Sequence, residues 1–136
     1  MASWKELSDL IHRSVQNRPE DANRLASMIE TLAGDEAPLA YHLTAQTPPE
    51  SEPLELDIAV LSPRRVYAFT LLADNNLSAT AVGLRQLTTV NIRGAGNVTI
   101  VRFLSGGDVV LTFADVGDRE QGLIEFARSV VKLAWP

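Results

Sequence analysis

The sequence predicts an α+β domain, in which a helical hairpin precedes a seven-stranded antiparallel bent sheet or partly open barrel, capped by a C-terminal helix. Three observations support this fold class. Apolar residues recur at helical spacing through the first 33 residues. From residue 39 they alternate with polar residues, or form short runs between turn residues, as they do in β-strands. A last helical stripe then runs from Leu123 to Ala134.

The N-terminal segment 1–34 is expected to form two helices. Ser3 and Glu6 have the spacing of a capping box, so the first helix should begin after Ser3. Pro19 is tolerated at the start of the second helix, and Gly34 is expected to end it in the left-handed conformation. The two apolar stripes are Trp4, Leu7, Leu10, Ile11 and Val15, and then Leu25, Met28, Ile29 and Leu32. Such short helices are not stable alone, so they should dock on the remainder or on a second copy.

Seven strands are expected between the hairpin and the final helix. Their ranges are 39–46, 54–60, 66–72, 77–84, 87–93, 98–104 and 109–113. The second, LELDIAV, alternates apolar and other residues and is predicted to be half-buried, whereas the third is apolar on both faces and predicted to be central. Ser62-Pro63-Arg64 should make a tight turn, and Gly106-Gly107 a hairpin.

The final helix has a second capping-box spacing at Asp118 and Gln121. Its stripe is typical of a helix docked on a sheet and comprises Leu123, Phe126, Ala127, Val130, Val131 and Ala134. No linker divides the chain. We therefore expect one domain over 1–136, with the hairpin at 1–34 and the β-structure and last helix at 39–134.

Composition excludes several classes of protein. The chain of 136 residues has no cysteine, which excludes disulfides, thiolate catalysis and cysteine-based zinc sites. No apolar run approaches the length of a membrane span. The N-terminus carries charges where an export signal would be apolar, so a cytoplasmic location is expected.

The net charge of −5 is unevenly distributed. Residues 34–57 contain six acidic side chains and no basic one. With a pI near 4.9 and only two lysines, the chain lacks the electrostatics of a protein that follows a phosphate backbone. Nucleic-acid binding is therefore not expected.

The order of seven antiparallel strands and one C-terminal helix, over 39–134, resembles the bacterial pleckstrin-homology-like (PH-like) and GRAM-like group. The residues that carry the resemblance are AVLSPRRVYAF from Ala59, where such domains often have a leucine-Ser/Thr-x-x-arginine-aromatic turn, VGLRQLTTVNIR from Val82, and FLSGGDVVLTF from Phe103. A lipocalin-like or other small barrel is the competing interpretation. The resemblance implies binding of phosphoinositides, peptides or proteins, and the hairpin lies outside the family's common pattern.

Arg64 and Arg65 are the first candidate contact residues for a ligand or partner. Two guanidinium groups beside a turn could hold a carboxylate or phosphate. The alternative is that a turn between apolar strands needs charge for solubility. Arg85, Arg93 and Arg102 could join them only if the fold gathers their side chains.

Glu50 and Glu52 are the second pair of candidates. They lie in the acidic, proline-rich segment TPPESEPLE, which is either a solvated connection or a recognition surface for a basic partner segment.

No catalytic, cofactor or metal site is expected. The two histidines, His12 and His42, have no metal-binding spacing, and a Ser62-His42-Asp57 triad lacks the glycine-flanked serine of a nucleophile elbow. Gly94-Ala95-Gly96 precedes a strand rather than a helix, so it is expected to be a turn and not a dinucleotide loop.

We therefore expect a non-enzymatic PH-like interaction module that binds a protein partner or self-assembles, as a homodimer or larger. The alternative is a carrier of a small molecule or lipid, with a pocket in the β-structure. Phosphoinositide binding is not expected, since the resemblance places the usual site at loops that here carry Glu50, Glu52, Asp74 and Asp108.

Overall fold

The computed structural model describes residues 3–15, 18–45, 56–72, 76–116 and 120–136. It confirms the α+β class, with an N-terminal helical pair, antiparallel strands and a C-terminal helix. The elements are α1 (Trp4–Ser14), α2 (Pro19–Ala33), β1 (Ala40–Ala45), β2 (Leu56–Leu61), β3 (Arg65–Leu71), β4 (Leu77–Gly83), a 3₁₀-helix η1 (Leu84–Gln86), β5 (Thr89–Ala95), β6 (Val98–Ser105), β7 (Asp108–Val116) and α3 (Glu120–Ala134).

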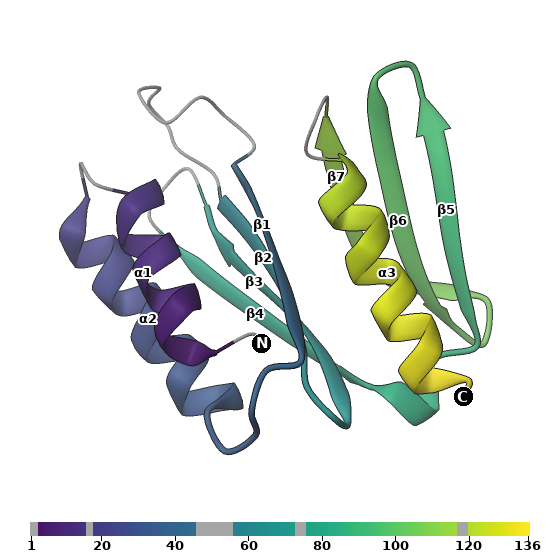
Figure 1. The fold of residues 1–136 in the computed structure, drawn as a ribbon, viewed down its shortest axis with the longest axis horizontal. Coiled ribbons are helices and arrows are strands. Elements are labelled where there is room, and N and C mark those ends of the chain that lie inside the picture. The colour runs from purple at the N-terminus through teal and green to yellow at the C-terminus, as the bar shows by residue number, and fades with distance from the viewer. Residues whose placement is uncertain (1–2, 16–17, 46–55, 73–75, 117–119) are drawn as a thin grey trace.

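The strands divide into two sheets, which do not close into a barrel (Figure 1). One sheet has four strands in the order β1-β2-β3-β4, and the other has three in the order β5-β6-β7. The α1–α2 pair covers one face of the four-stranded sheet, while α3 lies between the two sheets (Figure 1). Every strand pairing is antiparallel, and within each sheet the strands that follow each other in the chain are neighbours.

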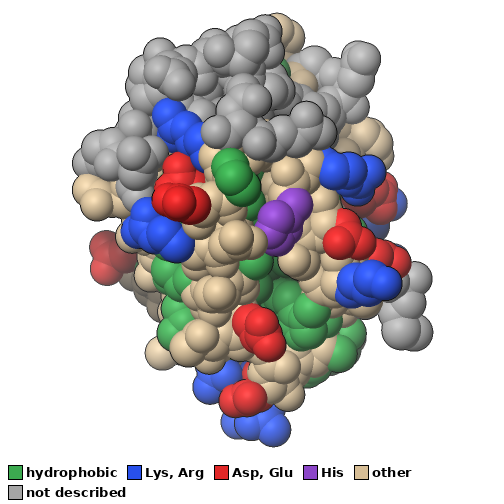
Figure 2. All heavy atoms as spheres, turned by 90° about the vertical axis from the view of Figure 1, so that its left-hand side faces the viewer, with side chains coloured by type: hydrophobic (Ala, Val, Ile, Leu, Met, Phe, Trp, Pro, Cys, Tyr) green, Lys and Arg blue, Asp and Glu red, His purple; other side chains and the backbone are tan. Residues whose placement is uncertain are grey.

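The helical pair docks on its own chain. Leu7, Ile11, Leu25 and Ile29 are each no more than 2% exposed, and they form one core with the face of the four-stranded sheet toward the helices. The sheet side of this core comprises Leu56, Ile58, Val60, Tyr67, Phe69 and Leu71. The predicted stripes thus contribute to a core within one molecule through Leu7, Ile11, Val15, Leu25 and Ile29, whereas Leu32 at the end of the second stripe is 53% exposed. The outer side of the pair carries interspersed acidic and basic side chains, with apolar ones gathered in its lower half (Figure 2).

A second core lies on the other face of the four-stranded sheet. It brings together Leu61 and Val66, the inner face of the three-stranded sheet, and the α3 stripe. The α3 residues in this second core are all at most 2% exposed: Leu123, Phe126, Ala127 and Val130. Val131, predicted to continue the stripe, is 37% exposed because it lies at the edge of the helix face. The Asp118 cap lies outside the described residues.

The prediction of a half-buried second strand was wrong. Ala59 and Val60 face opposite sides of β2, yet both are at most 1% exposed. The reason is that cores lie on both faces of this sheet, since the helices cover one side and α3 with the second sheet covers the other. Leu54 lies outside the described residues. The third strand is central, as its apolar faces predict.

Two helix ends test the capping predictions. Ser3 Oγ accepts from the Glu6 N–H at 3.1 Å, which confirms the first cap. Gly34 ends α2 with φ −68°, so the predicted left-handed conformation was wrong. A Cβ there would collide with the Glu30 carbonyl oxygen, so close approach explains the glycine.

The glycine turns agree with the sequence-based predictions better than the helix ends do. Gly106 and Gly107 have φ of 60° and 93° and make the predicted hairpin. Gly96 has φ of 65° and lies in a turn, but the predicted turn was wrong for Gly94 and Ala95, because both pair with β6 as part of β5. The short helix η1 was not predicted, because its three residues were assigned to the adjoining strand and its following turn. Among the described residues, no helix has the length and hydropathy needed to cross a bilayer.

Candidate functional site

Arg64 and Arg65 lie in and directly after the predicted turn between β2 and β3. The Ser62 N–H donates to the Arg65 carbonyl at 2.9 Å, and the Arg65 N–H donates to Ser62 Oγ at 3.2 Å. The Arg64 carbonyl accepts from the Leu84 N–H at 2.8 Å, which fastens the turn to η1. The backbone is therefore held at both positions, while both arginines are exposed to solvent.

This contact brings a third arginine to the turn. A groove of about 570 Å³ opens between the two segments, and its walls are Pro63, Arg64, Arg65, Gly83, Leu84 and Arg85; we call it the arginine groove. Its geometry follows from strand pairing, because Arg65 of β3 stands opposite Gly83 of β4. Arg85, two residues beyond that pair, consequently lies beside the turn.

The arginine groove carries an excess of positive charge. The Arg65 guanidinium Nη1 lies 3.3 Å from Glu36 Oε1, so one of the three charges is offset. Within the ranges that the structure describes, no carboxylate forms an ion pair with Arg64 or Arg85. Guanidinium groups bind carboxylates or phosphates through paired N–H donors, so the groove is suited to an anionic group.

The sequence singled out two of these arginines and left open whether Arg85, Arg93 and Arg102 join them. Arg85 is separated from Arg65 by a whole hairpin, and only the register of that hairpin joins them. Arg93 and Arg102 do not join the groove, because they lie in the three-stranded sheet, where their Cα partners include Ile100 and Asn91.

The acidic candidates are placed differently. Glu50 and Glu52 lie outside the described residues. The strands that flank them end at the paired residues Ala45 and Leu56, at the opposite end of β2 from the arginine turn. The expectation that Asp108 lies with that acidic loop was wrong.

Asp108 lies instead at the end of the fold that carries η1. It follows the Gly106-Gly107 hairpin, where the Gly106 N–H donates to Thr88 Oγ1 at 3.0 Å. Thr88 lies two residues after the end of η1, and the Leu87 N–H between them donates to the Leu84 carbonyl. Asp74 lies outside the described residues.

His42 forms a contact that the sequence did not indicate. Its Nε2 lies 2.6 Å from Oδ2 of Asp115, whose side chain is fully buried. The same oxygen lies 3.4 Å from the donor Thr44 Oγ1, and Asp115 Oδ1 accepts from the Val116 N–H. This pair links β1 of one sheet to β7 of the other. No pattern in the sequence indicated that the Asp115 carboxylate, which follows an apolar strand, would point into the protein.

The Ser62-His42-Asp57 triad is not assembled. Ser62 is buried in the arginine turn, and Asp57 Oδ1 accepts from Thr70 Oγ1 at 2.8 Å. His42 faces Asp115 instead. Because Ser62 Oγ contacts the Arg65 backbone instead of His42, the proposed triad does not supply an activated serine.

The other histidine bridges the two N-terminal helices. His12 Nδ1 lies 2.8 Å from the Ser8 carbonyl, and Nε2 lies 2.8 Å from Asn23 Oδ1. The Asn23 hydrogen bond, followed by the Ser8 one, raises the pKa of His12. Burial and the nearby Glu6 carboxylate raise the pKa of Tyr41. Within the described ranges, no three His, Asp or Glu side chains are grouped as metal ligands would be.

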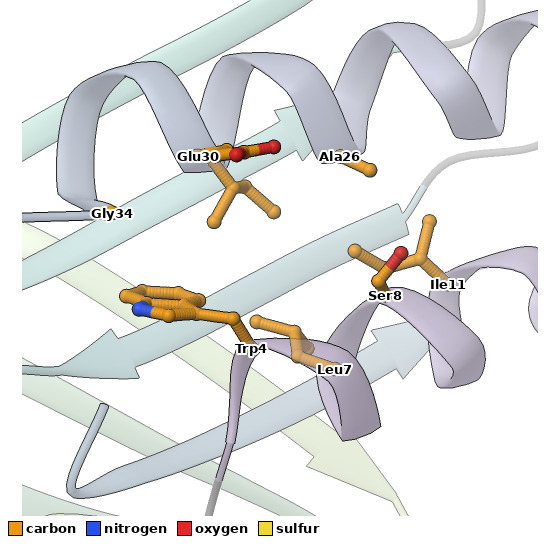
Figure 3. Close-up of a pocket in the computed structure, with 8 residues that line it drawn as sticks. Trp4, Leu7, Ser8, Ile11, Ala26, Glu30 and Gly34 are labelled. Carbon is orange, nitrogen blue, oxygen red and sulfur yellow. The ribbon is translucent and has the colours of Figure 1, made fainter. Parts of the chain in front are cut away.

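A small pocket of about 160 Å³ opens between α1 and α2 (Figure 3). Trp4 lies along one side of it, and Glu30 lies across from Trp4 on α2 (Figure 3). The indole is fixed because Trp4 Nε1 donates to the Glu36 carbonyl at 2.9 Å. The pocket is lined mainly by apolar side chains, and it belongs to the helical pair rather than to the β-structure.

Comparison with known proteins leaves the chain without a family. No protein-family model matches it, and no characterised protein matches it in sequence. Among solved structures, it is similar to the C-terminal domain of an unknown protein from Leishmania infantum. The TM-score is 0.49 and the identity 14%, over 77% of this chain and 93% of that chain.

Proposed function

We propose that the protein is a non-enzymatic, PH-like interaction module that binds an acidic segment of a protein partner in the arginine groove. The observation that carries the proposal is that the groove gathers Arg64, Arg65 and Arg85, only one of which has a carboxylate partner among the described residues. Carboxylates matched to these guanidinium groups would gain charge-assisted hydrogen bonds.

The PH-like part of the proposal is supported by topology. Four strands form one antiparallel sheet, three form a second, and an amphipathic helix follows and packs between them. This is the order of elements on which the sequence resemblance rests. The groove, and not the fold, supports the proposed function, because a fold of this kind carries many functions.

The charge balance favours a protein segment over a lipid surface. Stable attraction to an anionic membrane usually takes a cluster of about four to eight basic residues. The groove has three arginines, and Glu36 offsets one of them. A net charge of −5 on the whole chain further lowers attraction to an extended anionic surface.

The alternative function, a small-molecule or lipid carrier, needs room between the sheets. The aromatic side chains of the second core occupy much of that space: Phe113 packs edge-on against Phe103 at 5.9 Å and against Phe126 at 6.1 Å, between ring centroids. The observation that favours a small ligand is the pocket between α1 and α2 (Figure 3).

The proposed function is tested by binding a short fluorescent peptide of alternating glutamate and serine. We expect saturable, salt-sensitive binding, and the double variant Arg64→Glu, Arg85→Glu should raise the Kd roughly tenfold or more. The control is Arg93→Glu, Arg102→Glu, which changes the charge equally on the other sheet. Equal losses in both variants, or no binding by the wild type at low salt, would contradict the proposal.

A further inference from the structure

Strand β4 presents an outer edge that the described part of the fold leaves unpaired. It is the last strand of its sheet and pairs on one side only, with β3. All seven of its residues, LSATAVG, are uncharged, and none is proline. The four consecutive residues 78–81 are exposed. Exposed edges of this length usually carry a charge, a proline, a bulge or a cover, because they otherwise pair with another strand.

The other three outer strands each carry such protection. β1 lies against α3 and is tied to β7 by the His42–Asp115 contact. β7 also packs on α3, and its pairing with β6 is interrupted by a register shift at Phe103/Leu104. β5 carries a charge at Arg93 and a glycine at Gly94. Among the described outer strands, β4 alone lacks all of these features.

The helical layer also stops short of β4. Ala79 and Ala81 stand opposite Phe69 and Tyr67, on the face that the helices cover over β3. Both alanines are nevertheless exposed. Between α2 and the start of β4 lies an open groove of about 560 Å³, lined by Asn23, Arg24, Ser27, Met28, Thr31, Leu32 and Leu77.

We infer that β4 pairs with β4 of a second copy of this chain, antiparallel about a two-fold axis at Thr80. In that register Thr80 stands opposite its own counterpart, Ala79 opposite Ala81, and Leu77 opposite Gly83. No charged side chain meets a like charge, and the small residues allow close approach of the two edges. An isologous contact requires a self-complementary surface, and this uncharged strand provides one.

The same pairing covers further apolar surface. A two-fold axis perpendicular to the sheet keeps both helical pairs on one side of an eight-stranded sheet. The groove beside Leu77 then lies next to Gly83 of the second copy. Leu32, which is 53% exposed, borders that groove, and its only charged neighbour there, Arg24, is already 3.4 Å from Asp21 in its own chain.

Cysteine cross-linking tests both the partner and the register. The native chain has no cysteine, so a single Thr80→Cys substitution places one thiol on each copy. Directly opposed residues of antiparallel strands have Cα atoms about 4.5–5.5 Å apart, which lies within the range of disulfides. We expect mild oxidation to give a covalent dimer. Ser78→Cys is the matched control, because its two copies would be separated by about four residues along the strands, or roughly 13 Å.

Sedimentation velocity over a concentration series tests the interface without a cross-link. We expect the wild type to dimerise and Thr80→Lys to remain monomeric with an unchanged circular dichroism spectrum, since Thr80 is exposed. Thr89→Lys, on exposed β5, should still dimerise. A monomeric wild type, a dimeric Thr80→Lys variant, or equal cross-linking by Ser78→Cys would overturn the inference. If the wild type is monomeric, the outer edge of β4 would instead be open to pairing with an extended segment of a different protein.

This inference does not rest on the arginine groove. The variant Arg64→Glu, Arg85→Glu should keep the dimer while losing the acidic peptide. Thr80→Lys should lose the dimer and keep the peptide. The two proposals therefore fail separately.

Discussion

His42 Nε2 lies 2.6 Å from Asp115 Oδ2, and this contact joins the first strand of one sheet to the last strand of the other. Asp115 is 1% exposed, and its side chain contacts His42, Thr44 and the Val116 N–H in place of bulk water. A buried carboxylate is tolerated only when such partners satisfy it. The pair therefore fixes how the two sheets meet at this edge.

Removing either member of the pair should destabilise the fold. We expect His42→Ala to lower the free energy of unfolding by about 3 kcal/mol or more, because it leaves a buried carboxylate with fewer partners. The double variant His42→Ala, Asp115→Ala should lose less than the sum of the two single variants. Urea unfolding of all four proteins measures the coupling, and additive losses would show that the contact contributes nothing.

Gly122 of α3 should resist the usual stabilising change of helical glycine to alanine. A Cβ at Gly122 would lie 2.9 Å from Cε1 and 3.0 Å from Nδ1 of the His42 ring. Although alanine is favoured over glycine in a helix by about 1 kcal/mol, we expect Gly122→Ala to lower the melting temperature because Asp115 holds that ring in place. In a His42→Ala background the same change should raise the melting temperature. A stabilised single variant would show that the ring moves freely.

Val130→Asp should unfold the domain or reduce its stability by about 3 kcal/mol or more, because it buries an unpaired charge. Val130 is 0% exposed in the second core. Val131→Asp is the matched control, since its neighbouring side chain is 37% exposed and should tolerate the same substitution. A soluble Val130→Asp variant with an unchanged melting temperature would contradict the docking of α3.

His12 should make the contact between α1 and α2 depend on pH. Both its ring nitrogens face oxygen acceptors, so the protonated form is favoured and its pKa is raised from 6.5. The stabilisation is therefore complete below pH 6.5 and is lost as the pH rises through the raised pKa. An NMR titration should show Asn23→Ala lowering the pKa of His12, with Ser27→Ala as the control. An unchanged His12 pKa in Asn23→Ala would show that the amide does not bind the ring.

Vesicles containing phosphoinositides should not bind the protein above neutral vesicles at physiological salt. The groove's three arginines are fewer than a membrane-binding cluster usually contains, and the chain's net charge of −5 opposes approach to an anionic surface. Sedimentation with vesicles measures this. Saturable binding that is abolished by Arg64→Ala and Arg65→Ala would overturn both this expectation and the choice of a protein partner.

The order of elements could be predicted from the sequence because local patterns set it. Ser3 caps its helix through a contact three residues away, and Gly106-Gly107 turns the chain through its own backbone angles. The predictions that were wrong depended on which groups pack nearby in the folded protein. Whether Ala59 is buried depends on α3 and the second sheet, and why Gly34 is glycine depends on the Glu30 carbonyl.

The sequence by itself determined the fold class, the apolar stripes of the helices and the turn that carries Arg64 and Arg65. Each of these depends on residues close together in the chain, where spacing alone decides which side chains share a face. Only the tertiary structure decided that the helical pair docks on its own sheet, that Arg85 joins the arginine groove, and that Asp115 meets His42. These contacts join segments 20 to 73 residues apart, and they depend on strand register and sheet packing, which no local pattern encodes.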